Sequence, residues 1–234
     1  MKIGAIIFSR FSSSRLPGKA FIDVSGKTLL ERVIDRTKLI KSVDHISLAT
    51  SINSEDDAIA SYGKSRDIDV FRGSLHDVSE RAMGACKKFE YDHFIRICAD
   101  RPFLDASLYD HLISNHIINK CDLTTNIFPR IVPPGFTGEV LKVKKFIKML
   151  ELTNNSEDRE HVTRYFYKNP SNFLISNVEF KKEYNLPELR LVIDDTRDLK
   201  RARWIAEKIN ETDFVYNSNK IISFAQQWEK LNIK

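Results

Sequence analysis

Short apolar runs alternate with amphipathic helical patterns through the first half of this chain, and this alternation restricts its fold most strongly. Runs with the character of buried strands occupy residues 3–8, 44–50, 68–71, 94–98 and 123–126. Helical spacing of apolar residues between them predicts helices over residues 29–40, from 54 onward, over 77–89 and over 107–118. Strands and helices joined in this order by short connections predict an α/β fold with a doubly wound, mostly parallel sheet.

The pattern changes near residue 128, where Pro129, Pro133, Pro134 and Gly135 exclude a continuous helix. The following elements are predicted as a strand at 138–143, helices at 144–152 and 159–167, and a strand at 173–178. We therefore predict one domain, 1–234, that carries an inserted lobe at about 128–185.

Core-strand character returns at residues 189–193, which end at Asp194. A helix over 196–209 is then expected to close the sheet. The tail has apolar residues at near-helical spacing, which predicts a last helix at about 219–231.

The charge and cysteine content exclude few functions. The net charge of +5, from 37 basic and 32 acidic residues, is spread without runs and gives no reason to expect a nucleic-acid partner. The three cysteines are far apart, lack metal-ligand spacing and are predicted to be buried thiols of a reducing compartment. No apolar stretch approaches the roughly 20 residues needed to span a bilayer, and no secretory leader is evident. We expect a cytoplasmic protein without membrane contact.

A loop rich in cations and hydroxyls follows the first predicted strand. Within residues 9–19 it gathers Arg10, Arg15, Lys19 and four serines. Cations crowded into one loop repel each other, and an anion bound among them would remove that difficulty. Because open α/β sheets bind ligands at the carboxyl ends of their strands, the loop is predicted to hold a polyphosphate. It is not a Walker loop, because Ser13 and Ala20 replace the required Gly and Ser or Thr. The alternative is a solvated loop with ordinary surface charges.

Two aspartates, Asp100 and Asp194, each follow a predicted core strand. Because parallel strands end at the same edge of a sheet, both carboxylates are expected to face the cationic loop. Carboxylates beside a polyphosphate suggest Mg²⁺. The alternatives are that Asp194 or Asp195 caps the next helix and that Asp100 forms a turn with Pro102.

Two more polar segments are candidates for binding. Arg72-Gly73-Ser74 ends the third predicted strand, and Arg81 follows within the next helix. Arg159-Glu160-His161 is dense in polar groups. The alternatives are an ordinary helix start for the first segment and a structural histidine for the second.

These motifs, taken in order, resemble the signature of the cytidylyltransferases that make CMP-activated acidic sugars, and most closely the branch of the spore coat polysaccharide biosynthesis protein F. The resemblance runs from residue 3 to about 210. It rests on the basic loop, Ala49-Thr50-Ser51-Ile52-Asn53 with Asp56-Asp57, Arg72-Gly73-Ser74 with Asp77-Val78 and Arg81, Ala99-Asp100-Arg101-Pro102, Arg159-Glu160-His161-Val162-Thr163, and Leu191-Val192-Ile193-Asp194 with Asp198-Leu199.

The resemblance implies a Rossmann-like α/β/α sandwich and roles for individual residues. Catalysis is assigned to Arg15, Lys19, Asp100 and Asp194, of which the two aspartates hold Mg²⁺. Nucleotide binding is assigned to Arg10, Ser14, Arg15, Lys19, Thr50, Asn53, Gly73, Ser74 and Arg81. Acceptor binding is assigned to Arg101, Asn126, Glu139, Arg159 and His161.

The implied function is transfer of CMP from CTP to an acidic sugar, with release of pyrophosphate, for surface polysaccharide biosynthesis. The implied partners are CTP, a small-molecule acceptor and a second copy bound through the inserted lobe. Departures from the family pattern at residues 135–139, at Arg101 and after Asp194 leave the acceptor open. The alternatives are a nucleotidyltransferase acting on a sugar phosphate or a non-sugar acceptor, and a nucleotide-binding regulatory module without catalysis.

Overall fold

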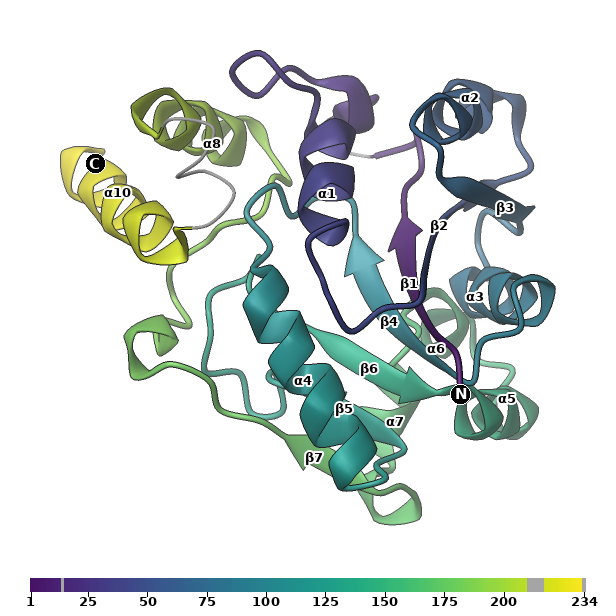
Figure 1. Cartoon of the computed structure of the whole chain (residues 1–234). Helices are drawn as coiled ribbons and strands as arrows, with labels where there is room; N and C mark the ends of the chain where they lie inside the picture. Colours follow the sequence, from purple (N-terminus) through teal and green to yellow (C-terminus); the bar gives the residue numbers. More distant parts are fainter. Residues whose placement is uncertain (14, 210–216, 233–234) are drawn as a thin grey trace.

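The computed structural model describes residues 1–13, 15–209 and 217–232. Its centre is a seven-stranded sheet in the order β3-β2-β1-β4-β6-β5-β7 (Figure 1). The strands are β1 (Ile3–Phe8), β2 (His45–Ser51), β3 (Asp69–Gly73), β4 (His93–Cys98), β5 (Leu123–Thr125), β6 (Glu139–Lys142) and β7 (Ile175–Asn177). β1 to β4 are mutually parallel, and β6 alone runs antiparallel to both of its neighbours. The predicted mostly parallel sheet is confirmed.

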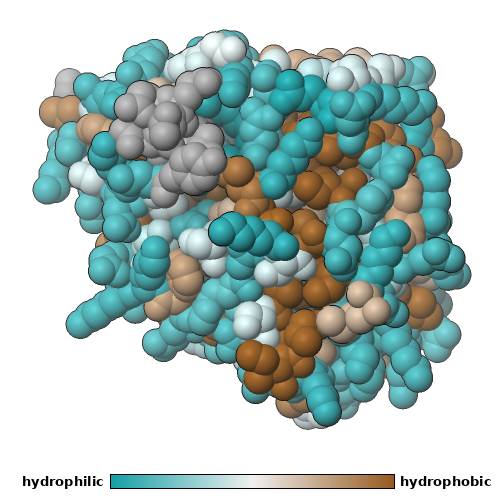
Figure 2. Space-filling view, viewed as in Figure 1, coloured by the Kyte–Doolittle hydropathy of each residue, from teal (hydrophilic) through white to brown (hydrophobic). Residues whose placement is uncertain are grey.

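Helices cover both faces of this sheet. They are α1 (Leu29–Thr37), α2 (Asp57–Ser65), α3 (Val78–Lys88), α4 (Ala106–Ile118), α5 (Val143–Leu152), α6 (Ser156–Glu160), α7 (Arg164–Lys168), α8 (Thr196–Lys208) and α10 (Ser218–Leu231). The predicted tail helix corresponds to α10. Hydrophilic side chains cover most of the surface seen in Figure 2, because the apolar stripe of each helix faces inward. Apolar side chains are visible between them.

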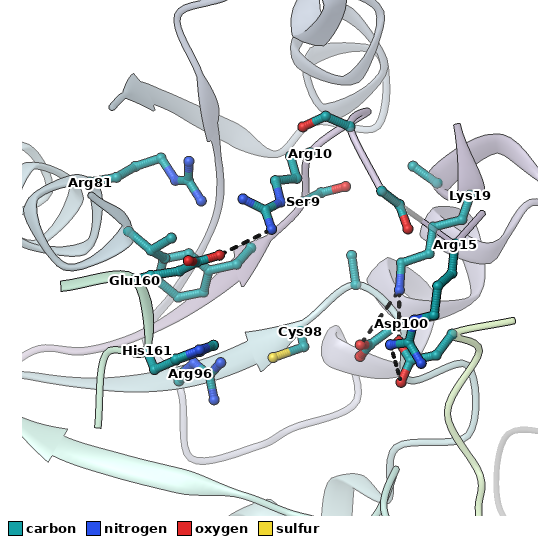
Figure 3. A pocket seen from close by; sticks show the side chains of 17 residues that line it. Ser9, Arg10, Arg15, Lys19, Arg81, Arg96, Cys98, Asp100, Glu160 and His161 are labelled. Carbon is teal, nitrogen blue, oxygen red and sulfur yellow. Dashed lines mark hydrogen bonds and ion pairs between the residues drawn. The ribbon is translucent and has the colours of Figure 1, made fainter. Parts of the chain in front are cut away.

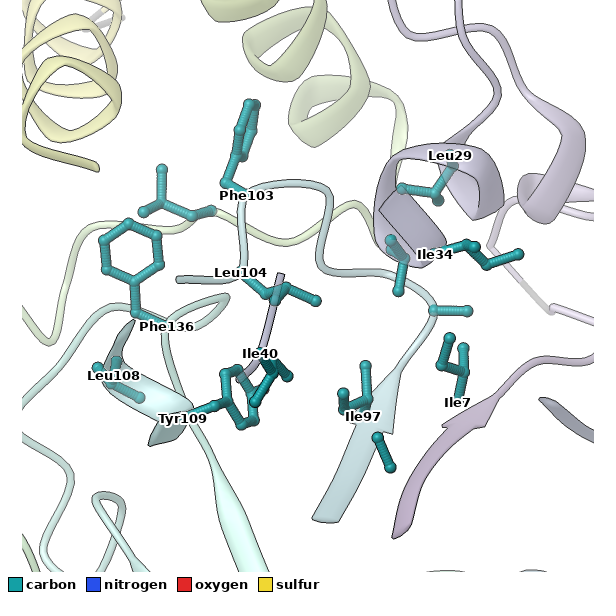
Figure 4. Close-up of a cluster of buried hydrophobic side chains, with 14 of the residues drawn as sticks. Ile7, Leu29, Ile34, Ile40, Ile97, Phe103, Leu104, Leu108, Tyr109 and Phe136 are labelled. Carbon is teal, nitrogen blue, oxygen red and sulfur yellow. The ribbon is translucent and has the colours of Figure 1, made fainter. Parts of the chain in front are cut away.

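Two apolar clusters, one on each face, make the sandwich. The first packs α1, α4, α8 and α10 on the sheet, and the second packs α3, α5 and α7 on the other side. In β1, Ala5 and Ile7 enter the first cluster and Ile6 enters the second. Figure 4 shows Ile7 and Ile97 beside the α1 side chains Leu29 and Ile34. A strand buried on both faces is a continuous apolar run, which explains why β1 was predictable.

Residues 189–193 are not a strand, although the sequence predicts one. Leu191 N–H donates to the carbonyl of Pro134 (2.7 Å) and Ile193 N–H to that of Asp100 (2.9 Å), outside any ladder. Gly135 makes this approach possible, because a Cβ there would lie 2.7 Å from the Leu191 carbonyl oxygen. The apolar pattern reported the burial of Leu191 and Ile193 correctly, but burial does not require strand pairing.

The segment 128–185, which was predicted to be an inserted lobe, supplies β6 and β7 to the central sheet. One further prediction needs correction. The predicted helix over 159–167 is broken between α6 and α7, where His161 has φ −102° and ψ 71°. Helices of five residues are too short to show a period of their own.

A buried histidine pair lies far from the carboxyl ends of the strands. His116 is fully buried, with Nε2 3.0 Å from His93 Nδ1 and Nδ1 2.9 Å from the Thr124 hydroxyl. Burial, and then the neighbouring charge of His93, lowers the pKa of His116 to about 3. Folded His116 therefore stays neutral at pH values where the unfolded chain takes up a proton.

Stability is accordingly expected to fall as the pH drops from about 6.5 toward 3, since the unfolded state binds more protons there. Between pH 7 and 5.5 His116 contributes a loss of about 1 kcal/mol. Urea unfolding of the wild type and His116→Gln at these pH values measures this loss. Equal losses in both proteins would contradict the assignment.

Candidate active site

A cleft of about 380 Å³ opens at the carboxyl ends of β1 and β4. Its walls come from the loop after β1, the start of α3, the end of β4, the end of α6 and Asp194 (Figure 3). Among the described residues, five cationic and three carboxylate side chains line it: Arg10, Arg15, Lys19, Arg81, Arg96, Asp100, Glu160 and Asp194. The predicted cationic loop and both predicted aspartates therefore meet in one cavity.

The loop after β1 is held by backbone contacts. Phe11 N–H donates to Asp56 (2.6 Å), Ser51 N–H donates to the other oxygen of the same carboxylate (2.9 Å), and Gly18 N–H donates to the Phe11 carbonyl (3.0 Å). Gly18 has φ 68°, the left-handed conformation that favours glycine. Asp56 thus joins the loop to the end of β2.

Lys19 lies between the two predicted catalytic aspartates. Its Nζ is 3.1 Å from Asp194 Oδ1 and 3.7 Å from Asp100 Oδ2, and it also donates to the Ile193 carbonyl (3.0 Å). Arg15 reaches the other Asp194 oxygen at 3.4 Å. Figure 3 shows Lys19, Arg15 and Asp100 gathered on one side of the cleft. The arrangement brings two negative and two positive groups to the place where phosphate chemistry was expected.

The two aspartates are held in different ways. Asp100 follows β4, and its Oδ1 is buried without a hydrogen-bond partner among the described residues. Asp194 follows the irregular segment, where its N–H donates to Asp198 (3.0 Å) and Arg190 lies 3.2 Å from its Oδ2. No group of three or more His, Cys, Asp or Glu side chains with metal-site geometry occurs in residues 1–13, 15–209 and 217–232. Two carboxylates with a free acceptor oxygen suit a cation that draws its other ligands from phosphate or water.

A second group of charges lies across the cleft. Arg10 pairs with Glu160 (3.3 Å), and Arg81 donates to the Ser74 carbonyl (2.7 Å). Burial, and then the nearby charge of Arg10, lowers the pKa of Arg81 to about 10. Arg81 therefore remains charged near neutral pH, and its repulsion from Arg10 would be relieved by an anion between them.

The other predicted nucleotide residues surround the cleft and do not line it. Thr50, Asn53 and Gly73 lie at the ends of β2 and β3. Ser74 accepts from Arg81 through its carbonyl and from Asp77 N–H through its hydroxyl. Ser14 lies outside the described residues.

Of the predicted acceptor residues, His161 lines the cleft and the other four lie elsewhere. Arg101 is buried against Tyr109, Asn126 holds the backbone of Phe136 and Gly138, and Glu139 pairs with Arg96. Arg159 donates to Asp77 (2.8 Å), the cap of α3. Their polar groups are engaged inside the protein, which the sequence could not distinguish from contact with a ligand.

Arg96, Cys98 and Glu160 line the cleft but were not predicted. Arg96 and Cys98 are alternate residues of β4, so they point to one face, and Asp100 continues the same spacing. Because Arg96 and Cys98 alternate in step with Asp100, the sequence could have placed them on the same side of the sheet as that candidate aspartate. Glu160 was only noted as part of a polar segment.

Asp56→Asn is expected to weaken the loop. An amide keeps one acceptor oxygen, so one of the two backbone N–H groups of Phe11 and Ser51 loses its partner. The expected cost is about 2 kcal/mol, which lowers the melting temperature by roughly 6 °C. Asp57→Asn is the matched control, because Asp57 is exposed and its ion pair with Arg72 lies at the surface. Equal melting temperatures for the two variants would contradict the role of Asp56.

Comparison with known proteins gives a consistent result. The sequence model described as cytidylyltransferase matches residues 4–221. The chain is 28% identical over 211 residues to the spore coat polysaccharide biosynthesis protein SpsF of Bacillus subtilis, covering 88% of this chain and 87% of that protein. It is 31% identical over 116 residues to the mitochondrial 3-deoxy-manno-octulosonate cytidylyltransferase of Arabidopsis thaliana, covering 48% and 39%.

A solved structure shares the whole fold. The cytidylyltransferase from Leptospira borgpetersenii superposes with a TM-score of 0.92 at 24% identity, covering 100% of this chain and 98% of that one. No helix within the described parts of this chain is both long and apolar enough to traverse a bilayer.

Proposed function

Because this chain belongs to the cytidylyltransferase family, we propose that it transfers the cytidylyl group of CTP to an acidic sugar and releases pyrophosphate. The observation that carries the proposal is Lys19 between Asp100 and Asp194, with Arg15 beside them. The likeness to SpsF supports a role in surface polysaccharide biosynthesis. A homodimer formed through residues 128–185 and a cytoplasmic location stay predictions.

In the proposed reaction an acceptor oxygen attacks the α-phosphorus of CTP, a new P–O bond forms, and the bond to the β-phosphate oxygen breaks. The protein must align these oxygens and offset charge on the phosphates. Arg15 and Lys19 both line the cleft, and we propose that they bind the leaving pyrophosphate, Arg15 through a forked guanidinium and Lys19 as a point charge. Across the cleft, we propose that Arg10 also contacts the triphosphate and that Arg81 lines the nucleoside pocket.

We propose Mg²⁺ as the cofactor, held by Asp100 and Asp194. When bound, it supplies positive charge at the reacting phosphates. The two partly exposed carboxylates that line the cleft beside Lys19 support this choice. Lys19 then exchanges its carboxylate partners for phosphate oxygens when the nucleotide enters.

A panel of CTP, UTP, dTTP and GTP, each with and without Mg²⁺, tests the donor by thermal shift. CTP with Mg²⁺ at about 100 times its Kd is expected to stabilise the fold by about 2.7 kcal/mol, or roughly 5–10 °C. UTP, dTTP and GTP are expected to raise the melting temperature less than CTP does. Stabilisation by another nucleotide above that of CTP would contradict the proposed donor.

Pyrophosphate release in the presence of ulosonic acids and sugar phosphates then tests the acceptor. Release with an acidic sugar supports the proposed function. Release only with a sugar phosphate or a non-sugar compound would show that the proposed acidic sugar is the wrong acceptor. CTP binding without release in any mixture would favour a regulatory module.

A further inference from the structure

Arg96 forms part of the cleft wall but has no place in the phosphate and metal chemistry described above. Phe94, Arg96 and Cys98 alternate along one face of β4, with Phe94 in the second apolar cluster and the next two in the cleft wall. In Figure 3 Arg96 and His161 lie on one side of the cleft, and Lys19 and Arg15 lie on the other. A guanidinium at this position faces the space left beside the proposed reaction centre.

Glu139 fixes Arg96 from behind. One Nη of Arg96 donates to Glu139 Oε2 at 2.7 Å, and the Tyr167 hydroxyl donates to Oε1 at 2.7 Å. The Glu139 side chain is only 1% exposed. Burial alone would raise the pKa of Glu139, but Arg96 and the hydrogen bonds from Thr163 and Tyr167 hold it below its usual value. Glu139 is therefore a charged, rigid anchor on β6, the strand next to β4.

The anchor leaves part of the guanidinium unused. The Nε of Arg96 is buried and has no hydrogen-bond partner among the described residues, while 22% of the side chain remains exposed. A buried donor without a partner is costly, and a guanidinium fork matches the two oxygens of a carboxylate or phosphate. An anion that enters through the cleft can pair with the exposed part of this guanidinium.

We propose that Arg96, held in place by Glu139, binds the anionic group of the acceptor and determines the specificity for acidic acceptors. Glu139 is then a positioning residue, which acts through Arg96. The identity of the occupant as the acceptor rests on the proposed transferase function, whereas the anion subsite itself does not.

Cys98 provides a test that requires no turnover. It lines the cleft two residues from Arg96, whereas Cys86 and Cys121 are buried. Alkylation of Cys98 by anionic iodoacetate is compared with alkylation by neutral iodoacetamide, and the modified residue is identified by mass spectrometry. Arg96→Gln is expected to lower the rate of alkylation by iodoacetate relative to the rate by iodoacetamide about fivefold, because it removes a positive charge that attracts the anionic reagent. Arg203→Gln, which removes the same charge from an exposed position on α8, is expected to leave the ratio unchanged.

The fold of the variants has to be controlled, because Arg96→Gln leaves Glu139 buried without a counter-charge. The double variant Arg96→Gln/Glu139→Gln removes both charges and serves for this purpose. It is expected to melt near the wild-type temperature and still show the lowered ratio. A wild-type ratio in the folded double variant would overturn the anion subsite.

Steady-state kinetics then tests specificity. For the acidic sugar that supports turnover, Arg96→Lys is expected to raise the acceptor KM about tenfold while the CTP KM stays unchanged, because an ammonium cannot form the fork. For the amide of the same sugar, Arg96→Lys is expected to change the acceptor KM little, because the amide carries no negative charge. Equal effects on the acid and its amide would overturn the role in specificity. If the wild type releases no pyrophosphate with any acid, the proposed function fails, and the alkylation ratio still decides whether Arg96 forms an anion site.

Discussion

Asp100→Asn is expected to lower pyrophosphate release from CTP at least about 10³-fold. The change removes a charge where the leaving phosphates require a cation, and it leaves Lys19 with Asp194 as its only carboxylate partner among the described residues. The melting temperature is expected to change little, because within the described part of the chain Asp100 Oδ1 is buried without a hydrogen-bond partner and has only a 3.9 Å ion pair with Arg101 Nε. Initial rates at saturating CTP and Mg²⁺, together with a melting curve, measure both effects.

Asp195→Asn is the matched control. Asp195 follows directly after Asp194, but its carboxylate accepts from Asp198 N–H (2.9 Å) as the cap of α8, and asparagine caps equally well. This variant is expected to keep wild-type rates. Wild-type release by Asp100→Asn, or an equal loss in both variants, would remove Asp100 from the proposed chemistry.

Lys19→Met is expected to lower turnover by a similar factor and to weaken CTP binding as well. Without its ammonium, Asp100 and Asp194 face each other with no cation between them, and the leaving pyrophosphate loses a positive partner. Lys19→Arg is expected to restore little, since a planar fork does not replace a point charge between two carboxylates.

Calorimetric CTP titration and pyrophosphate release measure these two losses separately. Lys27→Met, which removes a lysine paired with Asp35 outside the cleft, is the control and is expected to keep wild-type turnover. Tight CTP binding with normal release in Lys19→Met would contradict the proposed role of Lys19.

The sequence predicted those parts of the fold that depend on local pattern. β1 is buried on both faces and so appears as a continuous apolar run, and β4 keeps apolar residues on both faces around Arg96. The antiparallel insertion of β6 between β4 and β5 is a matter of long-range pairing, which no local pattern encodes. Residues 189–193 show where local pattern fails. Their apolar side chains are buried, but their backbone N–H groups bond to the carbonyls of Pro134 and Asp100 and not to a neighbouring strand.

The candidate site was predictable on its phosphate side and less so on its acceptor side. Arg15, Lys19 and Asp100 converge because each follows a parallel strand at the same edge of the sheet. Glu139, by contrast, was assigned to the acceptor but is buried behind Arg96. A polar residue in a core segment can face a ligand or another side chain, and only the tertiary structure separates the two.

The irregular segment before Asp194 gives the two aspartates unequal local stability. Asp100 is attached to β4, a central strand whose amides exchange with solvent only on extensive unfolding. The amides of Leu191 and Ile193 each depend on one hydrogen bond to a loop. Deuterium is therefore expected to enter at Leu191 and Ile193 well before it enters at Ile97. The wall that carries Asp100 is therefore expected to stay in place when the nucleotide binds. The wall that carries Asp194 can move without disturbing the sheet.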